Sequence, residues 1–151
     1  MAEMRSLVTW SDDYLLGLDE IDEQHKALFD LINAIWHLVV SKARDEETLR
    51  AVEELEKYAL IHFTSEEMFM RDTGFSAFAE HRSAHLGFIE RVAEERARVI
   101  AGQPIGLDLV HFLSDWLTDH ILVSDRRCVQ ELRGHARPGS ALGRIFRPFR
   151  G

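Results

Sequence analysis

Residues 19–41 read DEIDEQHKALFDLINAIWHLVVS, and apolar side chains recur in this stretch at steps of three and four. That period follows one face of an α-helix, so the stretch predicts a long amphipathic helix. The face consists of Ile21, His25, Leu28, Ile32, Ile35 and Val39. An isolated histidine on such a face is usually a core residue that a neighbour satisfies, and the alternative is a metal ligand.

Three further stretches show the same period and are separated by short breaks. The second helix is expected to begin near Asp45 and to stop at residues 72–74, which read DTG. The third runs from Ser76 to Ala101, and the fourth from about Leu107 to Arg133, where Gly134 closes it. Alternating patterns typical of strands are missing. Four helices with short connections predict an all-α fold, an up-down-up-down antiparallel four-helix bundle.

The length of 151 residues corresponds to one domain. We expect residues 1–133 to form it, with residues 1–17 as an extended N-terminal arm that packs Trp10 on the bundle and bends at Gly17. The single cysteine, Cys128, excludes an internal disulfide. Because no apolar run is long enough for a membrane span or a signal peptide, we expect a soluble, cytoplasmic protein.

Charge is divided unevenly along the chain. The net charge is −8, and residues 1–133 hold all 26 acidic residues against 14 basic ones. Such an acidic body repels phosphate groups, so nucleic acid is excluded as a partner. Residues 134–151 carry four arginines and no acid, interleaved with Leu, Ile and Phe. We expect a flexible tail that contacts an anionic membrane surface or an acidic protein partner, the alternative being a solvated extension.

Histidines and carboxylates recur at helical spacing in the other three predicted helices. His62 and Glu66 lie one turn apart on one face, and so do His81 and His85. His120 is followed by a carboxylate five residues later. Each of these pairs alone is weak evidence for a metal site, because surface pairs of the same spacing are common.

The combination of these groups predicts a shared metal site, since every helix of the bundle presents an imidazole inward. Burying five imidazoles and two carboxylates without a metal would leave polar groups unpaired, at about 1–3 kcal/mol each. His120 and Asp125 are offset by about 140° on a regular α-helix. Either they flank a metal pair from opposite edges of the inner face, or the helix widens locally into a π-type turn.

The order and spacing of these groups resemble the hemerythrin family, in particular its single-domain bacterial members. The matching segments are Trp10, residues 17–26, HFTSEE at 62–67, the histidine pair 81/85, and WLTDHILVSD at 116–125. The resemblance covers about residues 7–132. It implies two iron ions per chain, ferrous or ferric, joined by an oxo or hydroxo bridge. By this resemblance the ligands of one iron would be His81, His85 and His120, those of the other His25 and His62, and the bridging carboxylates Glu66 and Asp125.

The resemblance also implies reversible O₂ binding. Five imidazoles, two bridging carboxylates and the bridging oxygen fill all but one position of two octahedral irons, and O₂ can take the last. Oxygen-activating enzymes of the ferritin type use more carboxylates, so we expect an O₂ carrier, store or delivery protein and not an enzyme. The alternatives are a sensor of O₂, redox state or iron, and a di-iron oxidase or peroxidase. A zinc site is a further alternative, because imidazole and carboxylate do not select iron by themselves.

Apolar and aromatic residues accompany the predicted ligands. The set consists of Leu28, Phe29, Ile32, Trp36, Tyr58 and Trp116. These residues predict a dry pocket for O₂, and their other interpretation is ordinary bundle core. Asp22, three residues before His25, is expected either to accept a hydrogen bond from that imidazole or to interact with the helix dipole.

Overall fold

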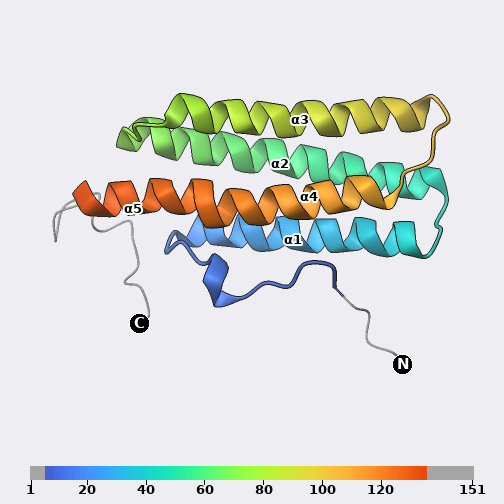
Figure 1. The fold of residues 1–151 in the computed structure, drawn as a ribbon, viewed down its shortest axis with the longest axis horizontal. Coiled ribbons are helices and arrows are strands. Elements are labelled where there is room, and N and C mark those ends of the chain that lie inside the picture. Colours follow the sequence, from blue (N-terminus) through green and yellow to red (C-terminus); the bar gives the residue numbers. More distant parts are fainter. Residues whose placement is uncertain (1–5, 136–151) are drawn as a thin grey trace.

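The chain folds as an all-α bundle, which confirms the predicted fold class (Figure 1). The structure is a computed structural model that describes residues 6–135. The elements are the 3-10 turn η1 (Asp12–Tyr14), α1 (Asp19–Val40), α2 (Asp45–Thr73), α3 (Phe78–Ile100), α4 (Leu107–Asp119), the π-helical segment η2 (His120–Asp125) and α5 (Arg126–His135). Consecutive helices run antiparallel, and α4, η2 and α5 form one continuous rod (Figure 1).

The ends of the helices differ from the predicted ends by one or two residues. Gly74 follows α2 with a φ of 74°, the left-handed conformation that terminates many helices. The third helix begins at Phe78 and not at Ser76. The amide and hydroxyl of Ser76 both donate hydrogen bonds to the carboxylate of Glu131 in α5, so this serine ties the turn between α2 and α3 to α5. The last helix continues through Gly134 to His135.

The predicted basic tail lies almost wholly outside the described residues, since these end at His135. Its contact with an anionic membrane surface or an acidic protein stays a prediction, and so does the boundary between residues 133 and 134. Among residues 6–135, no helix combines the length and the apolar character that crossing a bilayer requires.

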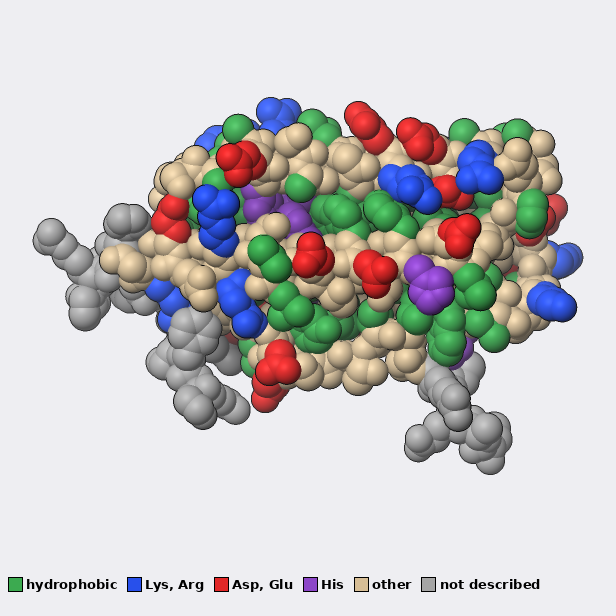
Figure 2. Space-filling model, viewed as in Figure 1, with side chains coloured by type: hydrophobic (Ala, Val, Ile, Leu, Met, Phe, Trp, Pro, Cys, Tyr) green, Lys and Arg blue, Asp and Glu red, His purple; other side chains and the backbone are tan. Residues whose placement is uncertain are grey.

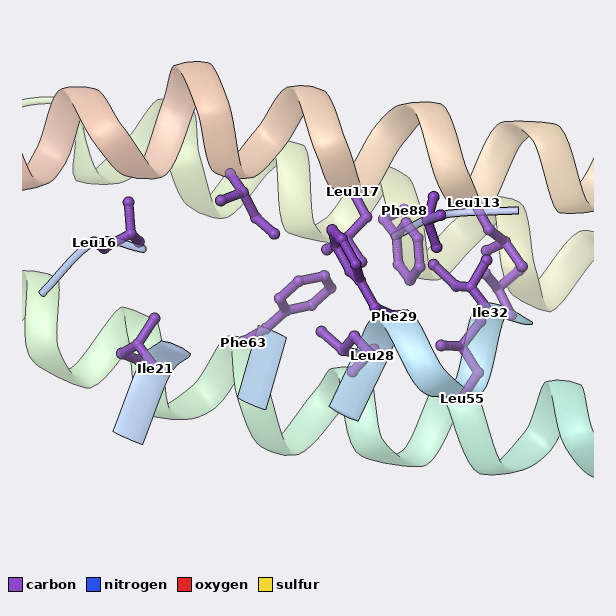
Figure 3. Packing of buried hydrophobic residues seen from close by; sticks show 14 of the residues in the cluster. Leu16, Ile21, Leu28, Phe29, Ile32, Leu55, Phe63, Phe88, Leu113 and Leu117 are labelled. Atoms are coloured by element: carbon purple, nitrogen blue, oxygen red, sulfur yellow. The ribbon is translucent and has the colours of Figure 1, made fainter. Parts of the chain in front are cut away.

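The apolar core extends along the bundle axis and reaches the histidines through one aromatic ring. Ile35, Leu55 and Leu113 have no exposed surface. In Figure 3, Leu16 lies at one end of the cluster, Leu55 and Leu113 lie at the other, and Phe63 lies between them. The Phe63 ring stacks on His85, with centroids 3.9 Å apart and an interplanar angle of 8°. Packing of the core therefore fixes the position of at least one imidazole.

The N-terminal arm is tied to the middle of α1 by Asn33. The Asn33 side-chain oxygen accepts hydrogen bonds from the amides of Leu7 (2.9 Å) and Val8 (3.0 Å), and its nitrogen donates to the Val8 carbonyl (2.8 Å). As predicted, Trp10 packs on the bundle, edge-on against Phe29 with centroids 5.3 Å apart. One amide side chain thus anchors the start of the described arm.

Asp22 anchors the other end of the arm, where the chain turns into α1. Its carboxylate accepts hydrogen bonds from the amides of Leu16 (2.9 Å) and Gly17 (3.2 Å). The φ of Gly17 is 85°, a left-handed value that favours glycine, so the predicted bend is present. Leu16, 2% exposed, is pressed into the bundle as a result.

Replacing Asn33 by alanine is expected to lower the free energy of unfolding by about 1–3 kcal/mol, because three hydrogen bonds to the arm are lost together. Urea denaturation monitored by circular dichroism measures the change. Asn33→Asp keeps both accepting interactions and is expected to lose less. A value for Asn33→Ala equal to that of the natural chain would mean that the arm is not held by this residue.

Candidate metal centre

Seven polar side chains meet inside the bundle, and none of them is more than 4% exposed. They come from all four rods of the fold. They are His25 of α1, His62 and Glu66 of α2, His81 and His85 of α3, and His120 and Asp125 of η2. These are the seven residues that the sequence predicts as metal ligands, and the structure brings all of them together.

The seven side chains form two groups that share Glu66. One group is Glu66, His81, His85 and His120, and the other is His25, His62, Glu66 and Asp125. Within each group, one ligand atom of every residue lies within 4.8 Å of the corresponding atoms of the others. The arrangement offers adjacent places for two metal ions, one beside three imidazoles and the other beside two.

The Glu66 carboxylate divides its two oxygens between the groups. Oε1 lies 2.5 Å from His81 Nε2 and 3.2 Å from His85 Nε2. Oε2 lies 3.2 Å from His62 Nε2 and 3.7 Å from His25 Nε2. Because each oxygen faces a different set of imidazoles, Glu66 has the geometry of a bridging ligand.

Asp125 makes the same division, and the π-helical segment is the reason. Oδ1 lies 2.9 Å from His81 Nε2 and 3.2 Å from His120 Nε2, and Oδ2 lies 3.2 Å from His25 Nε2. A π-helix hydrogen-bonds residues five apart, which brings His120 and Asp125 to one face of the rod. Of the two alternatives for this spacing, the structure therefore shows the π-type turn.

Most of the atoms that face the centre have no hydrogen-bond partner within the described protein. Buried without a partner are Nε2 of His25 and of His62, Oε2 of Glu66 and both carboxylate oxygens of Asp125. These atoms lie 2.9–3.7 Å from imidazole nitrogens or carboxylate oxygens of the same cluster, within reach of an ion pair but without a hydrogen bond. Imidazole nitrogens together with carboxylate oxygens suit iron and zinc among other divalent metals. A pair of metal ions therefore fits both the geometry and the donor set.

Two further residues orient the imidazoles, and neither is predicted from the sequence. Gln24 Oε1 lies 2.7 Å from His62 Nδ1, and Glu67 Oε2 lies 3.1 Å from His85 Nδ1. A donor bond from Nδ1 leaves Nε2 as the atom that faces the centre, which fixes the tautomer of a metal-binding histidine. The sequence offers one indication of these roles, which is that both residues are neighbours of predicted ligands. Gln24 directly precedes His25, and Glu67 directly follows Glu66. A helical wheel nevertheless places Glu67 away from the inner face.

Asp22 does not orient His25, which was one of its two expected roles. Both Asp22 oxygens accept bonds from the amides of the arm. The Nδ1 atom of His25 is buried without a hydrogen-bond partner among the described residues. The Asp22 carboxylate instead accepts hydrogen bonds from the turn before α1. The spacing of Asp22 and His25 in the sequence does not reveal this contact.

The residues predicted to line an O₂ pocket are spread along the core. Trp116 stacks on His120, with centroids 4.4 Å apart and an interplanar angle of 12°. Three others are buried in the face of α1: Leu28, Phe29 and Ile32. Tyr58 and Trp36 are half-buried, and Trp36 lies against His37. Trp116 thus lies beside the candidate metal centre, whereas Trp36 belongs to the apolar core beyond that centre.

The carboxylates raise the pKa of His25, His81 and His120 in the metal-free chain, whereas burial lowers the pKa of His62. Burial opposes the charged form, yet the pKa of His25 is raised to about 9 and that of His120 to about 10, because Asp125 and Glu66 stabilise the protonated rings. Burial also raises the pKa of the carboxyls, and the surrounding imidazoles outweigh it, so the pKa values of Glu66 and Asp125 lie below their usual range. At neutral pH, protonated imidazoles therefore supply part of the positive charge that metal ions would bring to this site.

These pKa shifts predict that the metal-free chain loses stability as the pH rises from 7 to 10. A histidine whose pKa is higher in the folded than in the unfolded chain stabilises the fold. This contribution is complete below about pH 6.5, the pKa in the unfolded chain, and it is lost as the pH passes 9 and 10. Metal affinity should rise over the same interval, because metal binding displaces these protons. Thermal denaturation in EDTA and titration with Co²⁺ measure the two trends. His25→Gln is the control and should flatten the stability slope; equal slopes in both chains would contradict the assignment.

The fold and the site together define a class: helical-bundle proteins with a buried histidine and carboxylate centre for a pair of metal ions. Comparison with known proteins agrees. The sequence profile of the family described as "Hemerythrin HHE cation binding domain" matches residues 16–132. The chain belongs to the hemerythrin family, and this membership implies a non-haem iron site.

Individual relatives match over nearly their whole length. The chain is 36% identical to a bacteriohemerythrin of Pseudomonas aeruginosa, over 95% of this chain and 98% of the relative. It is 32% identical to a bacteriohemerythrin of Stenotrophomonas maltophilia, over 97% and 99% of the two chains. A crystal structure of wild-type hemerythrin is similar with a TM-score of 0.77 and 28% identity, over 82% of this chain and 98% of that one.

Proposed function

We propose that the chain holds two iron ions and binds O₂ reversibly, as a cytoplasmic carrier, store or delivery protein. The observation that carries this proposal is the division of both bridging carboxylates between two imidazole groups. His81, His85 and His120 would hold one ion, and His25 and His62 the other. When bound, the iron pair supplies the electrons that O₂ binding requires.

The group with two imidazoles is the place where O₂ would bind. It offers one imidazole nitrogen fewer than the other group, while Glu66 and Asp125 each turn one oxygen toward either side, so an ion there would keep a free position. Trp116 and Phe63 pack against the histidines of the neighbouring group, and their rings would limit the access of water to the centre. A dry interior slows the proton-dependent loss of bound O₂ and supports binding in preference to catalysis.

The proposal is tested by cycles of oxygenation. Protein loaded with Fe²⁺ under argon is exposed to O₂ and then returned to argon, while its visible spectrum is recorded. We expect an absorption band that appears with O₂, disappears without it, and returns over several cycles. Permanent oxidation in the first cycle would indicate an oxidase or peroxidase, and failure to bind iron would overturn the proposal itself.

A further inference from the structure

A surface pocket of about 260 Å³ lies between the start of α3 and the η2–α5 junction. Phe75, Ala77, Ala84 and Val123 form its apolar walls, and Glu80, Ser124 and Arg127 supply polar groups. Figure 2 shows histidine side chains, in purple, at the bottom of a hollow between the α3 ridge and the ridge that follows α4. Because His81 is among its lining residues, the pocket lies beside the candidate metal centre.

One candidate ligand, His81, lines this pocket. Its Nε2 atom faces Glu66 and Asp125 in the interior, at 2.5 and 2.9 Å. Two polar pocket residues are chain neighbours of candidate ligands, since Glu80 precedes His81 and Ser124 precedes Asp125. The imidazole ring of His81 thus separates the pocket from the place that a metal ion would take beside His81, His85 and His120.

Two opposite charges stand at the mouth of the pocket. Arg127 Nη1 lies 3.9 Å from Glu80 Oε2, and both side chains are largely exposed, at 65% and 81%. An ion pair so open to water contributes little to stability. Its members can separate at small cost, so the charge that an approaching ion meets depends on both residues.

The pocket is wide enough for a hydrated cation, and Glu80, Ser124 and Arg127 give it polar groups. The volume of about 260 Å³ is many times the roughly 10–15 Å³ that one water requires in the same measure, so the pocket can admit a divalent ion with its first hydration shell. A second, much smaller pocket reaches Glu66 and Asp125 beneath Leu16, but its volume is about 10 Å³ and its exposed lining is apolar. A hydrated ion cannot pass through it.

We propose that the pocket over His81 is the entrance through which divalent metal ions reach the centre, with Glu80 attracting the ion and Arg127 opposing it. The inference rests on the proposed metal centre. It concerns the rate of metal uptake, whereas the centre itself determines how much metal is held at equilibrium. The two can therefore fail separately.

The test is the rate of Co²⁺ uptake by the metal-free full-length protein, followed in a stopped-flow instrument by the visible absorption of bound cobalt. At low ionic strength, Glu80→Gln should slow uptake about three- to tenfold, and Arg127→Gln should accelerate it by a similar factor. High salt should reduce both effects. Ala84→Phe, which fills the pocket, should slow uptake irrespective of salt.

Arg44 and Glu47 provide a matched control, because they form an exposed ion pair at the start of α2, with 3.4 Å between Nη2 and Oε1. Arg44→Gln and Glu47→Gln change the net charge by the same amounts and should leave the rate unchanged. The opposite directions of the two rate changes are the decisive result. Glu80→Gln and Arg127→Gln both break the same ion pair, so a purely structural role of that pair would change both uptake rates in the same direction. Equal signs, or no change in both, would overturn the entrance. Absence of Co²⁺ binding at equilibrium in the natural chain would instead overturn the proposed centre.

Discussion

Replacing Glu66 by alanine is expected to reduce the metal content of the purified protein from about two ions per chain to one or fewer. Glu66 is the only residue common to both ligand groups, and its oxygens face imidazoles on three other helical segments. Removing a partner that merely orients a ligand typically costs 10–100-fold in metal affinity. Loss of a shared ligand should exceed that range for at least one ion.

The adjacent carboxylate provides the control for this experiment. Glu67 lies 3.1 Å from His85 Nδ1, on the side of the ring away from the centre. Glu67→Ala should therefore weaken binding about 10–100-fold but still allow both ions to bind at saturating metal. Elemental analysis after gel filtration and a competitive titration against a chelator measure the two variants. Retention of both ions with unchanged affinity in Glu66→Ala would show that this carboxylate is not a bridge.

Phe63→Ala is expected to have the largest effect on stability, lowering the free energy of unfolding by about 3–5 kcal/mol. Phe63 is 2% exposed, and its ring contacts Phe88 and Trp116 as well as the stacked His85. Truncation leaves a cavity beside the imidazole, into which the surrounding helices can relax only in part. Urea denaturation of the metal-free chain measures the loss.

The same substitution should also admit water to the interior. We expect the iron-loaded variant to oxidise faster in air than the natural protein, since the stacked ring no longer shields His85. Phe63→Leu keeps most of the volume and should show smaller changes in both stability and oxidation. A loss below about 1 kcal/mol for Phe63→Ala would mean that the ring contributes little to the core.

The convergence of the seven candidate ligands could be predicted from sequence because helical geometry is regular. His62 and Glu66, or His81 and His85, share a face whenever their segment is helical, whatever the partner helices do. The periodic stretch 19–41 similarly fixes which face of the first helix is buried. These features depend on local spacing, and local spacing is what a sequence displays.

Features that depend on contacts between distant segments were not predictable. The π-helical turn at 120–125 is one of two solutions to the same spacing, and local spacing does not choose between them. Gln24 of α1 contacts His62 of α2, and Asp22 accepts hydrogen bonds from the N-terminal arm and none from His25. Ser76 likewise bonds Glu131, which lies 55 residues away, and it precedes the third helix, which starts at Phe78. The contacts of Gln24, Asp22 and Ser76 each involve a side chain with more than one available partner.

The most direct test of the central claim is anomalous X-ray scattering at the iron edge from crystals of the iron-loaded protein. Two peaks per chain are predicted, one among His81, His85 and His120 and the other beside His25 and His62, with Glu66 and Asp125 between them. A single peak, or peaks away from these side chains, would contradict the account.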